Sequence, residues 1–168
     1  MRYIAFLRGI NVGGNRIIPM QELKKLFEDL GFIEVETYIQ SGNVVFSSEK
    51  VKLEILTNGI KERVSFDIIV IVKTARELEK IIENNPFPES DKLGFMLLSK
   101  KPDKLEKLTT VDGKGEMIEI IDDVAYVVYS NGMGRAVYNN NFIEKILGVK
   151  ATTRNLRTMK KLLSICSK

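Results

Sequence analysis

The sequence contains no histidine and no tryptophan, and Cys166 is the only cysteine among its 168 residues. Histidine is the commonest general base and the commonest metal ligand in proteins, so its absence excludes Ser-His-Asp, Cys-His and zinc chemistry. A single cysteine cannot form an internal disulfide. Any reaction would have to use carboxylate, lysine, hydroxyl or backbone groups, and we expect neither a metal nor a cofactor.

Long hydrophobic runs are also missing. The longest apolar runs, such as residues 68–72, fall far below the roughly 18 residues that span a bilayer. The apolar stretch at residues 3–7 is too short for the core of a signal peptide. We therefore expect a cytoplasmic protein without a membrane partner. A length of 168 residues, with 44% hydrophobic and 29% charged side chains, fits one domain or two small subdomains.

Acidic side chains are absent from the C-terminal segment. Residues 145–168 carry seven lysines and arginines and no aspartate or glutamate, although the whole chain has a net charge of only +4. Such a segment favours an anionic partner, which could be phosphate, a nucleic acid or an acidic surface of the same molecule. The alternative is a solvated basic helix whose charges suit its own C-terminal dipole.

The first half of the chain has a regular order of predicted elements. Apolar runs and helical spacing predict the order β-α-β-β-α-β, at residues 3–7, 20–30, 35–40, 43–47, 51–64 and 68–72. Ser41 and Gly42 would form a two-residue turn between the second and third strands. This order is that of a ferredoxin-like domain, in which right-handed crossovers give the sheet order 4-1-3-2.

The second half is less regular but loosely echoes the first. We expect Thr74 to cap a helix, strands at 93–99, 116–121 and 124–129, a helix ending at Leu147, and a last helix at 155–165 capped by Thr152 or Thr153. The predicted fold is α+β, with a ferredoxin-like subdomain at 1–84 and a related, smaller α+β subdomain at 85–168 packed on it. The first and fourth strands are apolar on both faces, so the second half or another copy must cover them, in a monomer or a homodimer.

Two glycine-rich and amide-rich segments should meet at one edge of the first sheet. The loop Arg8–Asn15 follows the first strand, and the turn Gln40–Asn43 follows the second, parallel strand. The loop has the glycine spacing of a phosphate-binding P-loop, but Asn15 and Arg16 replace its lysine and hydroxyl residue, so we exclude nucleotide hydrolysis of that type. Its backbone N–H groups could still converge on an anion. The alternative is a structural loop whose asparagines satisfy local backbone groups.

A third polar cluster lies at Thr152–Thr158. If the threonines cap a helix, Arg154 and Arg157 share one face of its first turn and could hold an anion there. The alternative is that Arg154 pairs with carboxylates or carbonyls and docks the helix. No catalytic residues are identified, because no paired carboxylates lie in a predicted apolar pocket. The candidate ligand-binding residues are Arg8, Asn11, Gly13, Gly14, Asn15, Gln40, Ser41, Asn43, Arg154, Asn155 and Arg157.

Four segments together resemble the bacterial domain-of-unknown-function family 1697. They are Tyr3–Gly14, Leu30–Phe32, Thr37–Phe46 and Thr152–Asn155. The family has an aromatic residue after the Arg-Asn pair, where this chain has Leu156. The resemblance covers the whole chain and implies two α+β subdomains of ferredoxin-like character in a cytoplasmic bacterial protein. It implies no activity.

Three functions are consistent with the sequence. The first is binding of a phosphate-bearing ligand, a nucleotide or a nucleic acid, between the three polar clusters. Strand three offers Val44, Val45 and Phe46 but no pair of stacking aromatic residues, so nucleic-acid binding would be mostly electrostatic. The second is an enzyme of unknown reaction that orients an anionic small molecule with Asn11, Gln40 and Asn43. The third is a structural or interaction protein whose polar clusters hold its own two halves.

Overall fold

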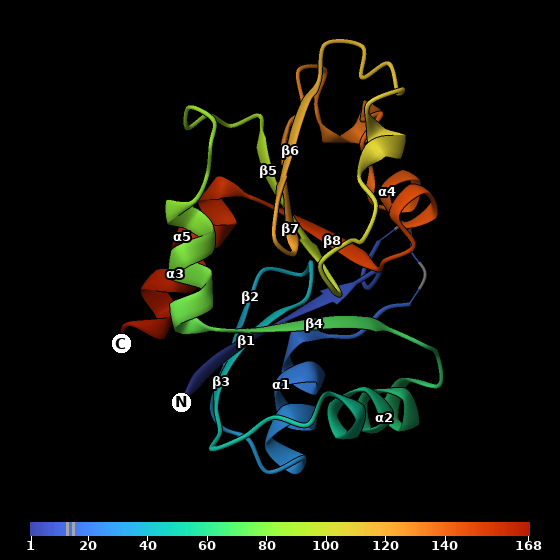
Figure 1. Ribbon diagram of the computed structural model, residues 1–168. Helices are drawn as coiled ribbons and strands as arrows, with labels where there is room; N and C mark the ends of the chain where they lie inside the picture. The colour runs from blue at the N-terminus through green and yellow to red at the C-terminus, as the bar shows by residue number, and fades with distance from the viewer. Residues whose placement is uncertain (13, 15) are drawn as a thin grey trace. The chain divides into compact units, whose positions relative to one another are not determined.

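The computed structural model describes residues 1–12, 14 and 16–168 (Figure 1). The chain divides into two compact units, one formed by Met1–Glu79 with Leu162–Lys168 and the other by Lys80–Lys161. We call them unit 1 and unit 2 and describe each by itself. The expected subdomain boundary after residue 84 lies a few residues beyond this division. The expected division into subdomains at residues 1–84 and 85–168 stays a prediction.

Unit 1 contains the predicted β-α-β-β-α-β order. Its elements are β1 (Arg2–Arg8), α1 (Met20–Asp29), β2 (Ile33–Tyr38), β3 (Asn43–Ser47), α2 (Leu53–Val64) and β4 (Ile69–Thr74). The strands form one antiparallel sheet in the order β2-β3-β1-β4, which is the 4-1-3-2 order expected from the sequence. The ferredoxin-like prediction for this part of the chain is confirmed.

The core of unit 1 lies between the sheet and its two helices, which cover the same face (Figure 1). Leu23, Leu26 and Phe27 point from α1 into this core because they recur at helical spacing. Leu56 and Ile60 do the same from α2. Ala5 and Leu7 meet them from β1, the central strand. The apolar pattern in the sequence therefore fixes which faces of these elements are buried.

The turn between β2 and β3 is longer than predicted. The last residue pair of the hairpin is Tyr38 with Asn43, so four residues connect the strands instead of Ser41 and Gly42 alone. Ile39 has φ 49° and Gly42 has φ 86°. The wider turn is held by the Asn43 side chain, which donates from Nδ2 to the Tyr38 carbonyl oxygen at 3.0 Å and to Ser41 Oγ at 3.1 Å.

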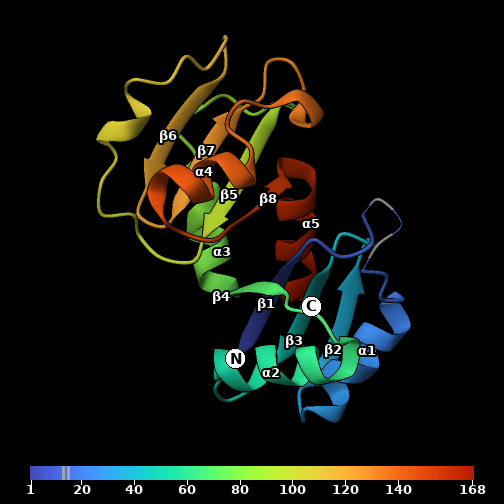
Figure 2. The same ribbon diagram turned by 90° about the vertical axis from the view of Figure 1, so that its right-hand side faces the viewer.

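Unit 2 repeats the sheet topology of unit 1 with fewer helices. Its strands are β5 (Leu93–Leu98), β6 (Met117–Ile121), β7 (Val124–Val128) and β8 (Ala151–Asn155). They form an antiparallel sheet in the order β6-β7-β5-β8, again 4-1-3-2 when counted along the chain. The helix α4 (Asn140–Leu147) covers one face (Figure 2). In place of the first helix there is only the 3₁₀ turn η1 (Glu106–Leu108).

The remaining helical segments have well-defined ends. They are α3 (Ala75–Glu83), the 3₁₀ turn η2 (Met133–Arg135) and α5 (Leu156–Cys166). Thr74 caps α3 as expected: its Oγ1 accepts from the Glu77 N–H at 3.2 Å, and Glu77 Oε2 accepts from the Thr74 N–H at 2.7 Å. Asn139 caps α4 by accepting from the Phe142 N–H at 2.9 Å.

The last helix begins within one residue of the expected position, but its expected cap is wrong. Thr152, Thr153 and Arg154 lie in β8, where they pair with Leu97, Met96 and Phe95 of β5. The helix begins only at Leu156, and Asn155 caps it by accepting from the Thr158 N–H at 2.8 Å. β-branched threonines fit a paired strand, and β5 supplies the pairing that turns them from caps into strand residues.

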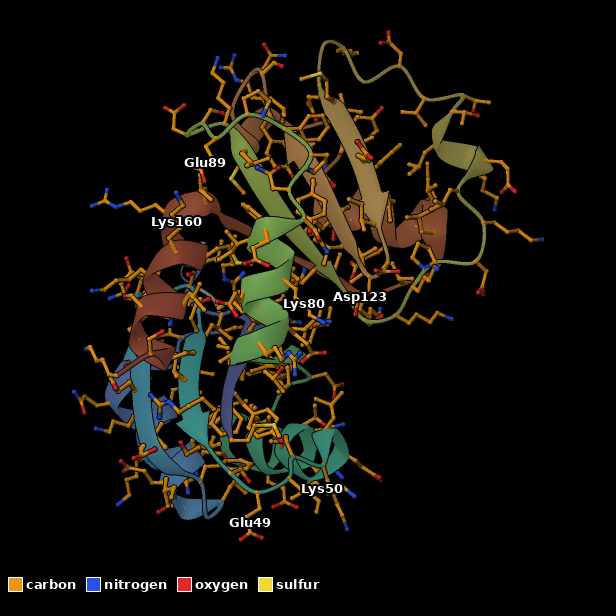
Figure 3. All side chains as sticks on the ribbon, turned by 60° about the vertical axis from the view of Figure 1, so that its left-hand side comes forward. Glu49, Lys50, Lys80, Glu89, Asp123 and Lys160 are labelled. Atoms are coloured by element: carbon orange, nitrogen blue, oxygen red, sulfur yellow. The ribbon has the colours of Figure 1, made fainter. Side chains whose placement is uncertain are left out.

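Polar contacts fix the irregular segments of unit 2. Glu116 is buried, and its carboxylate accepts from the backbone N–H groups of Val137 at 2.8 Å and Tyr138 at 3.1 Å. Lys160 of α5 forms an ion pair with Glu89 at 2.7 Å, both labelled in Figure 3.

Among the residues described, no helix has the length and apolar character needed to cross a membrane.

Candidate anion-binding edge of unit 1

The loop after β1 and the turn after β2 lie side by side, as the topology predicts. The Leu7 N–H, near the end of β1, donates at 2.8 Å to the carbonyl oxygen of Gly42, the last residue of the turn. The Asn11 side chain reaches the Gln40 carbonyl oxygen at 3.0 Å. Two segments about 30 residues apart in sequence therefore form one surface, which we call the loop–turn edge and which comprises residues 8–12, 14, 16–18 and 38–43.

The Asn11 side chain links the loop to the turn within this edge, and we call this set of hydrogen bonds the Asn11 bracket. Its Nδ2 donates to the carbonyl oxygens of Ile18 at 2.9 Å and Gln40 at 3.0 Å, and its Oδ1 accepts from the Ile18 N–H at 2.8 Å. Its φ is 55°, a left-handed conformation that asparagine adopts more readily than most residues. Both donor hydrogens and the acceptor of this carboxamide are used by the protein itself. A structural role accounts for Asn11 without a ligand.

Gly42 and Asn43 close the other side of the edge. A Cβ atom on Gly42 would lie 2.8 Å from Ile10 Cδ1 and 3.0 Å from Leu7 Cβ, so only glycine fits against the loop without displacement. Asn43 is fully buried, and its side-chain amide bonds Tyr38 and Ser41 within the turn. The turn is thus shaped by close packing against the loop.

Arg16 is the cationic group that the edge presents to solvent. Its guanidinium carbon lies over the Phe66 ring, 5.5 Å from the ring centroid, in a cation–π contact. Among the residues described, Arg16 makes no hydrogen bond or ion pair through its side chain. The nearby carboxylate of Asp67 is paired with Lys61 at 2.9 Å. The hydrogen bond and charge of Lys61, with a smaller contribution from the charge of Arg16, lower the pKa of Asp67. The Arg16 N–H donors remain available for an anion.

Exposed apolar side chains surround the same bracket. Val12, Ile17 and Ile39 have relative exposures of 68%, 65% and 47%. Each is adjacent in sequence to Asn11 or to a residue that bonds it, so all three gather around one carboxamide. The edge therefore combines a guanidinium with an apolar surface.

The candidate residues of the third cluster belong to unit 2 and differ from one another. Arg154 is 7% exposed; it donates from one Nη to Thr152 Oγ1 at 2.8 Å and to the Thr153 carbonyl oxygen at 2.9 Å. Burial lowers the pKa of Arg154 to about 10. Arg157 is exposed on α5. The expectation that these two arginines share one face of a helical turn is wrong, because β8 pairs with β5 and places Arg154 in a strand.

The structure brings together some of the predicted site residues and not others. Arg8, Asn11, Gln40, Ser41 and Asn43 lie in the loop–turn edge, and Gly14 belongs to the same loop. Gly13 and Asn15 lie outside the described residues. The stacking of Arg16 on Phe66 was missed, because no sequence pattern links positions 50 residues apart. Within the described residues, no group of three or more cysteines, aspartates or glutamates is arranged to hold a metal ion.

Comparisons with known proteins agree with this architecture. The family described as "Protein of unknown function (DUF1697)" matches residues 1–126. The chain belongs to this family. Among solved structures, the chain is similar to "conserved bacterial protein SP0830 from Streptococcus pneumoniae", with 23% sequence identity, a TM-score of 0.75 and coverage of 98% of each chain. This similarity shows the fold alone. No curated protein matches the chain.

Proposed function

We propose that this member of the DUF1697 family binds a phosphate-bearing anion, a nucleotide or a nucleic acid, at the loop–turn edge of unit 1. The observation that carries the proposal is the exposed Arg16 guanidinium, which lies over the Phe66 ring and forms no salt bridge within the part of the chain that the structure describes. A fixed guanidinium can offer two parallel N–H donors to a phosphate.

The surroundings of Arg16 support the same ligand class. Residues 8–18 contain Arg8 and Arg16 and no acidic side chain, and residues 38–47 contain no charged side chain at all. An anion approaching the edge meets no repulsive carboxylate from either segment. The bracket made by Asn11 keeps the two segments in register, so little ordering is needed when the ligand binds.

The donor set of this site is narrower than the sequence suggested. The side-chain amides of Asn11 and Asn43 bond to groups of the protein itself and are not offered to the ligand. Arginine side chains and the exposed polar side chain of Gln40 would make the contacts instead. This assignment also weakens the enzyme hypothesis, since two of its three orienting side chains have structural roles.

The test is direct titration at low salt. Inorganic phosphate, ATP and a single-stranded oligonucleotide are titrated into the protein and into Arg16→Gln, with Arg76→Gln as the control. Arg76 is an exposed arginine of α3, which follows β4 at the opposite end of the sheet. If the oligonucleotide binds, Arg16→Gln should reduce the slope of log affinity against log salt by about 0.7, the value for one phosphate contact on a single strand.

Two results would contradict the proposal. One is the absence of binding to all three probes at low salt. The other is an equal loss of affinity in Arg76→Gln and Arg16→Gln, because that would indicate a response to net charge instead of a site.

A protein partner is the second candidate function. Val12, Ile17 and Ile39 are exposed together on the edge, and clustered apolar side chains of this kind mark interaction surfaces. Here Ile17→Ser should abolish partner binding while phosphate and ATP titrations stay as in the unchanged protein. Loss of phosphate binding in Ile17→Ser would instead assign this residue to the anion site.

A further inference from the structure

A second polar network lies at the opposite end of the unit 1 sheet, around Arg2. Its guanidinium donates to the Glu34 carbonyl oxygen at 2.9 Å and to Ser47 Oγ at 3.3 Å. It also approaches the carboxylates of Glu34 at 3.5 Å and Glu36 at 3.6 Å. The Arg2 side chain is only 19% exposed. One guanidinium thus joins the ends of three strands.

The same guanidinium reaches the end of α5. One Nη of Arg2 lies 3.5 Å from the Ile165 carbonyl oxygen, in the last turn of the helix, where carbonyl groups lack helical partners and attract a cation. Lys168 adds an ion pair with Glu36 at 3.8 Å. Leu162 and Ile165 of the same helix are buried. The end of α5 is therefore held by buried apolar side chains and by two partly exposed polar contacts, Arg2 with the Ile165 carbonyl and Lys168 with Glu36, which we call the rim contacts.

The backbone geometry of β2 directs Glu34 toward Arg2. The β2–β3 register shifts between Ile33 and Glu36, and Glu34 in this bulge has φ 52°. A bulge redirects a side chain and a carbonyl group. At Glu34 both face the same guanidinium, and the carboxylate also accepts a hydrogen bond from Ser47 Oγ. A left-handed glutamate is uncommon, so the bulge is shaped around this contact.

We propose that the Arg2 network is a conformational latch that closes the end of α5 on the sheet, and that opening of the latch exposes the thiol of Cys166. Cys166 is half-buried and lines a cavity of about 490 Å³ together with Arg2, Glu34 and Glu36. The contacts of Arg2 with the Ile165 carbonyl oxygen and of Lys168 with Glu36 are long and partly exposed, so each contributes little. Opening is confined to residues 166–168, beyond buried Leu162 and Ile165, and therefore has a modest free-energy cost. The inference is independent of the anion site, which lies at the other end of the sheet.

Electrostatics and opening predict opposite changes when Arg2 is replaced. Burial raises the pKa of the Cys166 thiol, and the positive charge of Arg2 lowers it. Removing that charge in Arg2→Gln leaves less thiolate at a given pH, which by itself slows reaction with a disulfide reagent. Opening of the latch exposes the thiol and accelerates the same reaction. The sign of the change therefore distinguishes a latch from a local charge effect.

The experiment measures the rate of reaction of Cys166 with 5,5′-dithiobis(2-nitrobenzoate) at one pH near 8. Arg2→Gln should react faster by roughly two- to fivefold, the factor by which losing exposed ion pairs shifts an equilibrium. Arg63→Gln is the matched control, because it removes the same positive charge from the same unit and breaks an ion pair, that of Arg63 with Asp29 at 2.8 Å. Its rate should equal that of the unchanged protein.

Three outcomes would overturn the latch. They are an unchanged rate in Arg2→Gln, a slower rate, and an equal increase in Arg63→Gln. If Arg2→Gln fails to fold by circular dichroism, the unchanged protein decides: raising KCl from about 0.05 M to about 1 M screens the rim contacts. Hydrogen exchange at residues 166–168 should then accelerate relative to residues 20–29, and equal exchange at both salts would refute the proposal.

Discussion

Replacement of Asn11 by alanine is the sharpest test of how the loop–turn edge is built. The substitution removes three hydrogen bonds, two donated to the carbonyl oxygens of Ile18 and Gln40 and one accepted from the Ile18 N–H. Each is worth about 1 kcal/mol net, and the left-handed φ of 55° adds about 1 kcal/mol more for alanine. Water can replace part of the loss at the exposed Gln40 carbonyl. We expect unit 1 to lose about 3 kcal/mol of unfolding free energy.

The assay is urea denaturation followed by far-ultraviolet circular dichroism. Because the two units can unfold in separate transitions, hydrogen exchange of residues 2–8 and 43–47 should accompany it. Gln40→Ala is the matched control: Gln40 takes part through its backbone carbonyl, which the substitution leaves in place, so its stability should change by less than about 0.5 kcal/mol.

Two results would refute this account of Asn11. If Asn11→Ala unfolds at the same urea concentration as the unchanged protein, the bracket does not form in solution. If Asn11→Ala keeps its stability but loses affinity for phosphate, the carboxamide serves a ligand and the structural role is wrong.

Three further predictions test other parts of the structure. Gly42→Ala should lower the free energy of unfolding in urea by about 2–4 kcal/mol, because overpacking against Ile10 and Leu7 adds to the cost of a left-handed backbone with φ 86°. Gly14→Ala, with φ 75° and no atom within 4 Å of the new Cβ, should lose only about 1–2 kcal/mol. Equal losses in the two variants would exclude a contribution from overpacking. Glu116→Ala leaves two backbone N–H groups of unit 2 without their acceptor, so it should reduce the free energy of unfolding by about 2–3 kcal/mol and lower the melting temperature in calorimetry. Glu116→Gln keeps one acceptor oxygen and should lower the melting temperature less. Identical melting temperatures of the two variants would contradict this prediction. Burial raises the pKa of Tyr126 and of Tyr129 to about 12, above the unfolded value of 10.0, so their contribution to stability is complete below pH 10 and is lost as the pH rises toward 12. The absorbance at 295 nm should show this late titration, and the double variant Tyr126→Phe and Tyr129→Phe should lack it. A double variant that titrates as the unchanged protein does would refute the prediction.

Local patterns were sufficient for the architecture of unit 1. Helical spacing of Leu23, Leu26 and Phe27 located α1, and the β-α-β-β-α-β order with right-handed crossovers gave the sheet order. Because the first and second strands are parallel with the third between them, the same order placed the Arg8–Asn15 loop beside the Gln40–Asn43 turn. These features follow from sequence because side-chain periodicity and chain handedness are local properties.

Pairing and burial between distant segments decided the rest. Thr152 and Thr153 are as suited to a helix cap as to a strand, and only the register with β5 made them strand residues and buried Arg154 beside them. The internal use of the Asn11 carboxamide depends on where the Gln40 carbonyl lies, and the cation–π contact of Arg16 depends on where the Phe66 ring lies. The elements of unit 1, their order and the groups available for binding were thus predictable from local sequence. The identity of β8 and the internal partners of these groups were not, because strand pairing and hydrogen bonds need both partners in place.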